Sequence, residues 1–176
     1  MLPSGNIIGL FPLPFLFSET SMKLLLTLCL ACLFTLPAQA ARRLGEAQVR
    51  MGKDDLPCFT IAEREEGRGG NPDFQAVTVM EGARVLWRMA MPRERTFALA
   101  FSMCVPYGGR VPALPQTAAA PLANGAVYTV QLDTRPGRNA GAPLRYTARF
   151  CLTSRANGAT AVQHIGANTG AACKTP

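Results

Sequence analysis

Large apolar side chains recur at every second position along much of the chain between residues 46 and 152. In TFALAFSMC (residues 96–104) the alternation is unbroken. Such a pattern is typical of a β-strand with one buried face. Strand-like segments of this kind occupy seven ranges: 46–51, 56–62, 73–80, 83–90, 96–104, 126–133 and 144–152. No segment after residue 40 has a sustained helical period, so the pattern predicts strands throughout.

The connections between these segments are of two kinds. Polar turns at 52–55 and 81–82 are short enough to predict hairpins. The charged, glycine-rich residues 63–72 and the proline-rich residues 105–121 have no period and are expected to be loops. The Gly/Ala-rich tail, residues 153–176, is expected to be weakly structured.

Seven short strands joined by hairpins and one long connection predict an all-β fold, a small antiparallel β-sandwich of immunoglobulin-like, Greek-key type. The spacing of Leu122, Gly125 and Tyr128 resembles a tyrosine corner, in which a Tyr hydroxyl bonds to nearby backbone. The alternative is a tyrosine that simply packs in its strand.

The segment before residue 41 carries an export signal. Met22-Lys23, an apolar run and PAQA match the charged, apolar and cleavage regions of a secretory signal, with cleavage expected after Ala40. The apolar run is shorter than the roughly 20 residues that span a bilayer. Residues 1–21, with three prolines and no basic residue, are either an upstream start artefact or an extended n-region. The expected organisation is 1–21, signal peptide 22–40, β-domain 41–152 and tail 153–176.

Cys32 offers a competing signal, because a cysteine behind a small residue, here Ala31, is a lipidation candidate. The position three before it is Cys29, where a lipobox has a branched apolar residue. Cleavage after Ala40 would remove Cys32, so we expect a soluble periplasmic protein rather than a lipid-anchored one.

An even number of cysteines remains after that cleavage, and in an exported chain this predicts two disulfides with three connectivities. In regular strands, Cys58, Cys104 and Cys151 would lie on the face opposite the aromatic side chains. This placement favours disulfides that join strand ends and the tail. We therefore expect Cys58 to pair with Cys104, and Cys151 to pair with Cys173 and hold the tail. After Ala40, no CxxC motif or Cys/His cluster indicates zinc.

Composition narrows the chemistry further. The formal net charge of +7 would attract anionic lipid, nucleic acid or an acidic protein, but the basic residues are scattered singly, which disfavours a nucleic-acid groove. The one histidine, His164, lies in the tail, and the GxSxG and HExxH motifs are absent, so we expect no enzyme, cofactor or metal. Met89 and Met91 suggest a further hypothesis, a Cu(I) carrier, because thioether groups bind Cu(I). The alternative is that these methionines pack in the core, as is common on strands.

The candidate partner-binding residues are arginines on two strands and two residues of the long connection. If the strands at 83–90 and 144–152 lie in one sheet, their arginines form a face suited to carboxylates or phosphates; an ordinary solvated surface is the alternative. Tyrosine and arginine in the connection are types enriched at interfaces. The set is Arg84, Arg88, Arg145, Arg149, Tyr107 and Arg110.

Five motifs behind the signal segment, VRMGKDDLPCFTI, VLWRM, CVPYG, LANGAVYTVQL and RYTARFCL, together resemble a family of small bacterial periplasmic proteins. Many members are lipoproteins, and the family is regarded as type VI secretion immunity proteins; the resemblance runs from Val49 to Leu152. It implies neutralisation of a toxic effector by occlusion, and the basic charge favours an acidic effector as protein partner. The alternative is a periplasmic envelope-binding or hydrolase-inhibitor module. The weak lipobox at Cys32 departs from the lipoprotein members.

Overall fold

The structure, a computed structural model, describes residues 43–109, 114–135, 141–166 and 173. The chain divides into two units, residues 1–41 and 42–176, and every described residue belongs to the second. The expected signal peptide with Cys32, and the binding candidate Arg110, lie outside the described residues. In the described part, no helix has the length and apolar character needed to span a membrane.

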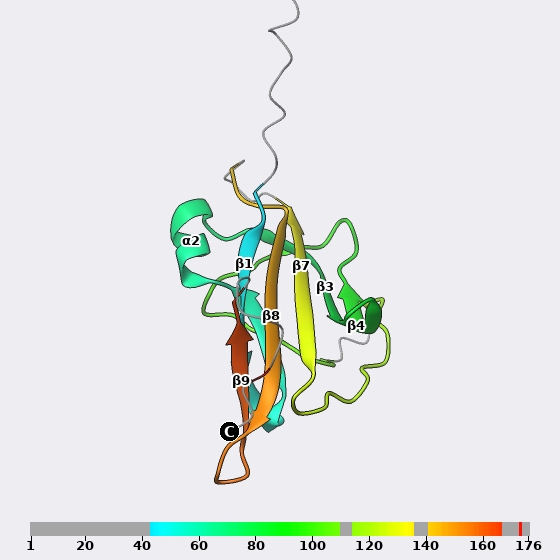
Figure 1. Cartoon of the computed structure of the whole chain (residues 1–176). Helices are drawn as coiled ribbons and strands as arrows, with labels where there is room; N and C mark the ends of the chain where they lie inside the picture. The colour runs from blue at the N-terminus through cyan, green and yellow to red at the C-terminus, as the bar shows by residue number, and fades with distance from the viewer. Residues whose placement is uncertain (1–42, 110–113, 136–140, 167–172, 174–176) are drawn as a thin grey trace, which may run out of the picture. The chain divides into compact units, whose positions relative to one another are not determined.

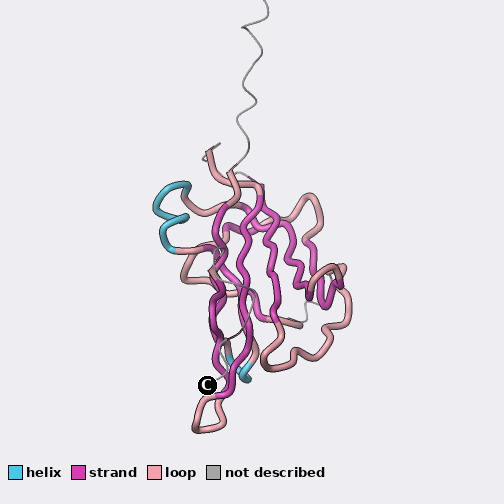
Figure 2. The backbone as a smooth tube through the Cα atoms, viewed as in Figure 1, coloured by secondary structure: helices cyan, strands magenta, loops and turns pink. Residues whose placement is uncertain are grey.

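Strands are the main regular structure of the described part, with one short helix (Figure 1, Figure 2), which confirms the predicted all-β fold. The strands are β1 Gly45–Met51, β2 Pro57–Ile61, β3 Asp73–Glu81, β4 Arg84–Ala90, β5 Phe97–Ala98, β6 Val105–Pro106, β7 Val127–Arg135, β8 Arg145–Ser154 and β9 Thr160–Ile165. The short 3-10 turn η1 Lys53–Asp55 joins β1 to β2, and the helix α2 Glu63–Gly69 follows β2.

The described strands form one continuous sheet, in the order β4-β3-β7-β8-β1-β2-β6, with β5 on β3 and β9 on β8. Only β1 and β8 run parallel, through Gly45 and Glu46; the rest of β1 pairs antiparallel with β2. The predicted antiparallel immunoglobulin-like sandwich is not confirmed, because β1 joins both halves into a single mixed sheet that curls into a half-barrel. The ends of the path are β4 and β6.

Aromatic side chains fill the concave side of the sheet. The Phe59 ring lies 5.8 Å from Phe150 and 6.4 Å from Trp87 between centroids, and Tyr128 packs on Phe150 at 5.5 Å. All four are almost fully buried. The Tyr128 hydroxyl donates to the carbonyl of Ala123 (3.1 Å) and accepts from its N–H (2.7 Å), which confirms the tyrosine corner.

Both predicted disulfides are confirmed. Cys58 on β2 is bonded to Cys104, just before β6, with their Cα atoms 5.5 Å apart. Cys151 on β8 is bonded to Cys173 near the C-terminus, at 6.2 Å between Cα atoms.

The expected loop at residues 63–72 is wrong in its first part, which forms α2. Acidic Glu63, Glu65 and Glu66 occupy the first turn and Arg68 the last, a charge order that complements the helix dipole. Gly70 ends the helix with a φ of 67°, a conformation that glycine adopts without strain.

The long strand expected at 96–104 is also wrong, since only Phe97–Ala98 pair, as β5. Beyond them Leu99 turns inward and its N–H donates to the carbonyl of Pro72 at 2.8 Å. The guanidinium of Arg50 covers the Phe101 ring at 3.9 Å, and the disulfide holds Cys104 against β2. Tertiary contacts thus override the local alternation.

Part of the expected unstructured tail is ordered as β9, which pairs antiparallel with β8 from Ser154↔Thr160 to Arg149↔Ile165. The tight turn between them contains Gly158 at a φ of 80°. Ala161 and Ile165 are buried, so β9 has an apolar side that the composition of the tail concealed.

Candidate functional site: the arginine groove

A groove opens where β1 leaves β8. After Glu46, β1 turns away to pair with β2, and β9 occupies the freed edge of β8 from Arg149 onward. The Nε2 of His164 on β9 lies 2.8 Å from the carbonyl oxygen of Val49, so Nε2–H donates and ties β9 back to β1. Figure 1 shows α2 beside the end of β1 that meets β8.

The groove has a volume of about 770 Å³, which lies within the range of ligand sites. Three elements, α2, β8 and β9, and the chain before β1 contribute basic side chains to its wall. These residues, which we name the arginine groove, are Arg43, Arg64, Arg68, Arg149 and His164. The rest of the lining includes the hydroxyl-bearing Thr129 and Thr147 and the apolar Leu44 and Ile165.

One of the two carboxylates of the groove is buried. The Glu65 side chain is 3% exposed, and the Nη1 group of Arg43 donates to both its oxygens, Oε1 at 2.8 Å and Oε2 at 2.7 Å. Hydrogen bonds between charged partners are stronger than those between neutral ones. It fixes α2 to the residues that lead into β1.

Tyr146 lies beneath the same pair. Its ring fills the space beside Gly45, where a Cβ would come within 2.3 Å of the ring, so no larger residue fits there. The hydroxyl is fully buried without a hydrogen-bond partner among the described residues. Burial, together with the negative Glu65, raises the pKa of Tyr146 to about 12, and Arg43 offsets part of this rise.

The other carboxylate, Glu46, is paired with Arg64 at the surface. Both glutamates of the groove are therefore in ion pairs with arginines. Arg68 and Arg149 form no ion pair with any described residue. The groove accordingly offers unpaired guanidinium groups and hydroxyls, which is the chemistry of binding carboxylates or phosphates.

Arg149 is the one sequence-predicted residue in the groove, and it also belongs to the outer face of the sheet. Residues directly opposed across strands share a face, and Arg88, Thr78, Gln131 and Thr147 form one such row. Arg145 and Arg149 flank Thr147 on that face. The structure therefore places Arg88, Arg145 and Arg149 on one face, with Arg88 on β4 separated from β8 by β3 and β7. Arg145 is held by Asp133 at 2.8 Å.

Arg84 does not join this face as expected. A β-bulge puts Met80 opposite Val85 and Val79 opposite Trp87, so the side-chain parity of β4 changes between them. Val85, 52% exposed, takes the outer position. Arg84 lies at the β3–β4 turn, 3.4 Å from Glu81.

Tyr107 is a correction to the predicted interface. It is 4% exposed, packs edge-on against Trp87 at 5.3 Å, and donates its hydroxyl proton to the carbonyl of Ala120 at 2.7 Å. Burial raises its pKa to about 12, and Tyr128 adds to the effect. Tyr107 closes the core under the long connection and is not available to a partner.

The sequence-based prediction missed Arg43, Arg64, Glu65 and Arg68. A weak signal was present, since three acids precede Arg68 in a stretch that can form two helical turns. The local sequence contains no signal that β1 pairs in parallel with β8, about a hundred residues later. This pairing assembles the groove.

The methionines fall into two sets. Met89, Met91 and Met103 line one apolar cavity, whereas Met80 lies on the outer face and Met51 at the end of β1. Within the described ranges, no group of three or more His, Cys, Asp or Glu side chains is placed to hold a metal ion.

Comparison with known proteins gives no relative: no protein-family model, no curated protein and no solved structure matches the chain.

Proposed function

We propose that this chain is an exported binding protein that neutralises a type VI secretion effector by occlusion. In this proposal the arginine groove and the adjoining outer face of β8 receive an acidic segment of the effector. The observation that carries the proposal is the pair Arg68 and Arg149, which have no ion-pair partner among the described residues and line a groove whose glutamates are both neutralised.

The framework around the groove suits occlusion. Arg149 projects from a strand that pairs on both sides, with β7 and β9, and Arg68 from a helix fixed by the Arg43–Glu65 pair. A rigid array of donors loses little entropy when it binds. Two disulfides favour an oxidising compartment such as the periplasm.

A charge-reversal variant tests the groove. In binding measurements with a purified effector encoded beside this gene, R68E/R149E should weaken affinity at least tenfold and flatten the salt dependence. R155E is the matched control, because Arg155 is exposed in the β8–β9 turn, beyond the end of β8 that is remote from the groove. It should change affinity less than twofold.

A strain that lacks the gene should become sensitive to the effector, and the R68E/R149E variant should fail to restore resistance. Unchanged sensitivity of the deletion strain, with no binding by the purified chain, would overturn the proposal. The envelope-binding or hydrolase-inhibitor module is the alternative that this outcome favours. Binding to anionic vesicles or to a purified hydrolase would then distinguish those two.

A further inference from the structure

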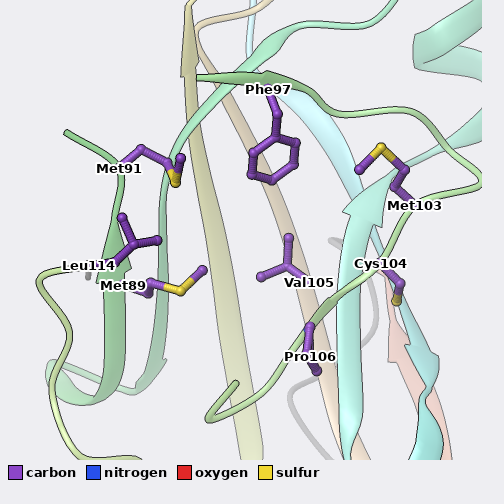
Figure 3. A pocket seen from close by; sticks show the side chains of 8 residues that line it. All are labelled: Met89, Met91, Phe97, Met103, Cys104, Val105, Pro106 and Leu114. Carbon is purple, nitrogen blue, oxygen red and sulfur yellow. The ribbon is translucent and has the colours of Figure 1, made fainter. Parts of the chain in front are cut away.

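A second cavity lies between β4 and β6, the two strands at which the sheet path ends (Figure 3). Its volume is about 330 Å³. The half-barrel does not close directly between these strands. The backbone of β4 bonds instead to the long connection, through Met89↔Gln116, and side chains line the remaining gap. The principal ones are Met89, Met91, Phe97, Met103, Val105 and Leu114.

The lining selects an apolar occupant. Every residue around the cavity is apolar, apart from the disulfide-bonded Cys104. The methionines approach from two sides in Figure 3, Met89 and Met91 from β4 and the following residue, and Met103 from the segment before β6. Unbranched thioether side chains adapt to flexible apolar ligands. Met103 is 43% exposed, so the cavity is accessible from solvent.

The size of the cavity limits that occupant to one chain. A water molecule occupies roughly 30 Å³, so a volume of about 330 Å³ accommodates about ten groups of methylene size. A single aliphatic chain of eight to ten carbons, roughly, therefore fits by the same measure, whereas the two chains of a phospholipid do not.

The loop next to the cavity carries positive charge. Met91 and Phe97 both line the cavity, and the residues that join them include exposed Arg93 and Arg95. The guanidinium of Arg135 donates to the carbonyl of Arg93 at 3.0 Å, which adds a third positive charge. Glu94 is the one acid in this loop. None of the three arginines is in an ion pair with a described residue.

We propose that this cavity binds a free single-chain carboxylate of medium length, with the aliphatic chain among the methionines and the carboxylate at Arg93 and Arg95. The apolar lining and the volume point to the aliphatic chain of that ligand, and the charge of the adjoining loop points to its carboxylate. The site is separate from the arginine groove, so it stands or falls independently of the proposed effector.

Methionine methyl NMR tests the site in the unaltered protein. Decanoate is the probe, added to the disulfide-bonded chain labelled at the methionine methyl carbons. The methyl resonances of Met89, Met91 and Met103 should shift saturably, while that of Met80, on the outer face, should not. Equal shifts at Met80, or no shift at the three cavity methionines, would overturn the proposal.

Substitutions then separate the chain from its head group. Met91→Trp fills the cavity and should reduce decanoate affinity at least tenfold, whereas Val85→Trp adds the same ring on the outer face and should leave it within twofold. R93Q/R95Q should weaken decanoate several-fold, and the control R155Q should not. The cavity resonances of R93Q/R95Q without ligand report whether the variant keeps its fold.

Three further probes define the class of ligand. Acetate, which has the head without the chain, and decyltrimethylammonium, which has the chain with the opposite charge, should each bind at least tenfold more weakly than decanoate. Phosphatidylglycerol vesicles should leave the cavity resonances in place. Preferential binding of the cation would overturn the role of the arginines, and binding of vesicles without binding of decanoate would overturn the free carboxylate as ligand.

Discussion

Two buried tyrosines differ in one hydrogen bond. The hydroxyl of Tyr107 donates to Ala120, whereas that of Tyr146 has no partner among the described residues, although both rings are almost fully buried. In the unfolded chain a tyrosine hydroxyl is hydrogen-bonded to water. Burying it without a new partner therefore lowers the stability of the fold. The same chemical change at the two sites should therefore affect stability with opposite sign.

Tyr146→Phe should raise the free energy of unfolding by about 1 kcal/mol, and Tyr107→Phe should lower it by a similar amount. Urea unfolding at neutral pH, monitored by Trp87 fluorescence, measures both. Destabilisation by both substitutions would show that the Tyr146 hydroxyl has a partner in solution, such as an ordered water.

The same two side chains should give an alkaline signature. In the unfolded chain a tyrosine ionises near its ordinary pKa of 10.0, whereas in the fold burial raises the pKa of Tyr107 and Tyr146 to about 12. Between these values the folded chain retains protons that the unfolded chain has lost, so stability is full below pH 10 and falls as the pH rises toward 12. Each Phe variant should show a shallower decline over that window.

At the scale of elements, one ion pair joins α2 to the start of β1. Glu65 is 3% exposed and Arg43 is 42% exposed, so the two partners are desolvated to different extents. Removing the arginine would leave a buried carboxylate without its countercharge. Removing the carboxylate would leave an arginine that solvent reaches.

Arg43→Ala should therefore destabilise the chain by about 2 to 4 kcal/mol, and Glu65→Gln by less. The double variant should be more stable than Arg43→Ala alone, because the stranded charge is gone. Arg64→Ala is the matched control, since the Arg64–Glu46 pair is exposed on both sides and should contribute less than about 1 kcal/mol. Equal losses for Arg43→Ala and Arg64→Ala would contradict the burial argument.

The elements that could be predicted from sequence are those that local pattern determines. β1 with β2, and β3 with β4, are hairpins whose alternation and turns lie within a few residues, and all four formed close to the expected bounds. α2 and β9 were missed because their apolar content is low and their stability comes from distant partners, Arg43 and β8. The expected strand at 96–104 did not form because contacts with distant residues override its local alternation, such as the Cys58–Cys104 disulfide and the Arg50–Phe101 contact.

The site was less predictable than the fold. Parity placed Arg145 and Arg149 on the outer face, but the bulge between Val79 and Met80 reversed the expected relation of Arg84 to Arg88. The sequence contains no local sign of such a bulge. The groove itself depends on contacts between segments far apart in the chain, which periodicity does not encode.

At the scale of the whole molecule, the two disulfides constrain different parts of the fold. Cys58–Cys104 closes a loop of 46 residues and fixes the segment that precedes β6 against β2. Cys151–Cys173 closes a loop of 22 residues and joins β8 to a residue beyond β9. In the chain-entropy description, removing the first should cost about 4 kcal/mol and the second about 3 kcal/mol.

C58A/C104A should therefore lose more stability than C151A/C173A in urea unfolding under non-reducing conditions. The two variants should also differ in their effect on the apolar cavity between β4 and β6, because Cys104 lines this cavity and Cys151 does not. The first variant should shift the methyl resonance of Met103, whereas the second should leave it unchanged.

Since a domain of this size has a total stability of about 5 to 15 kcal/mol, reduction of both bonds should bring it close to unfolding. A larger loss from C151A/C173A would mean that the C-terminal bridge stabilises native contacts well beyond its loop entropy.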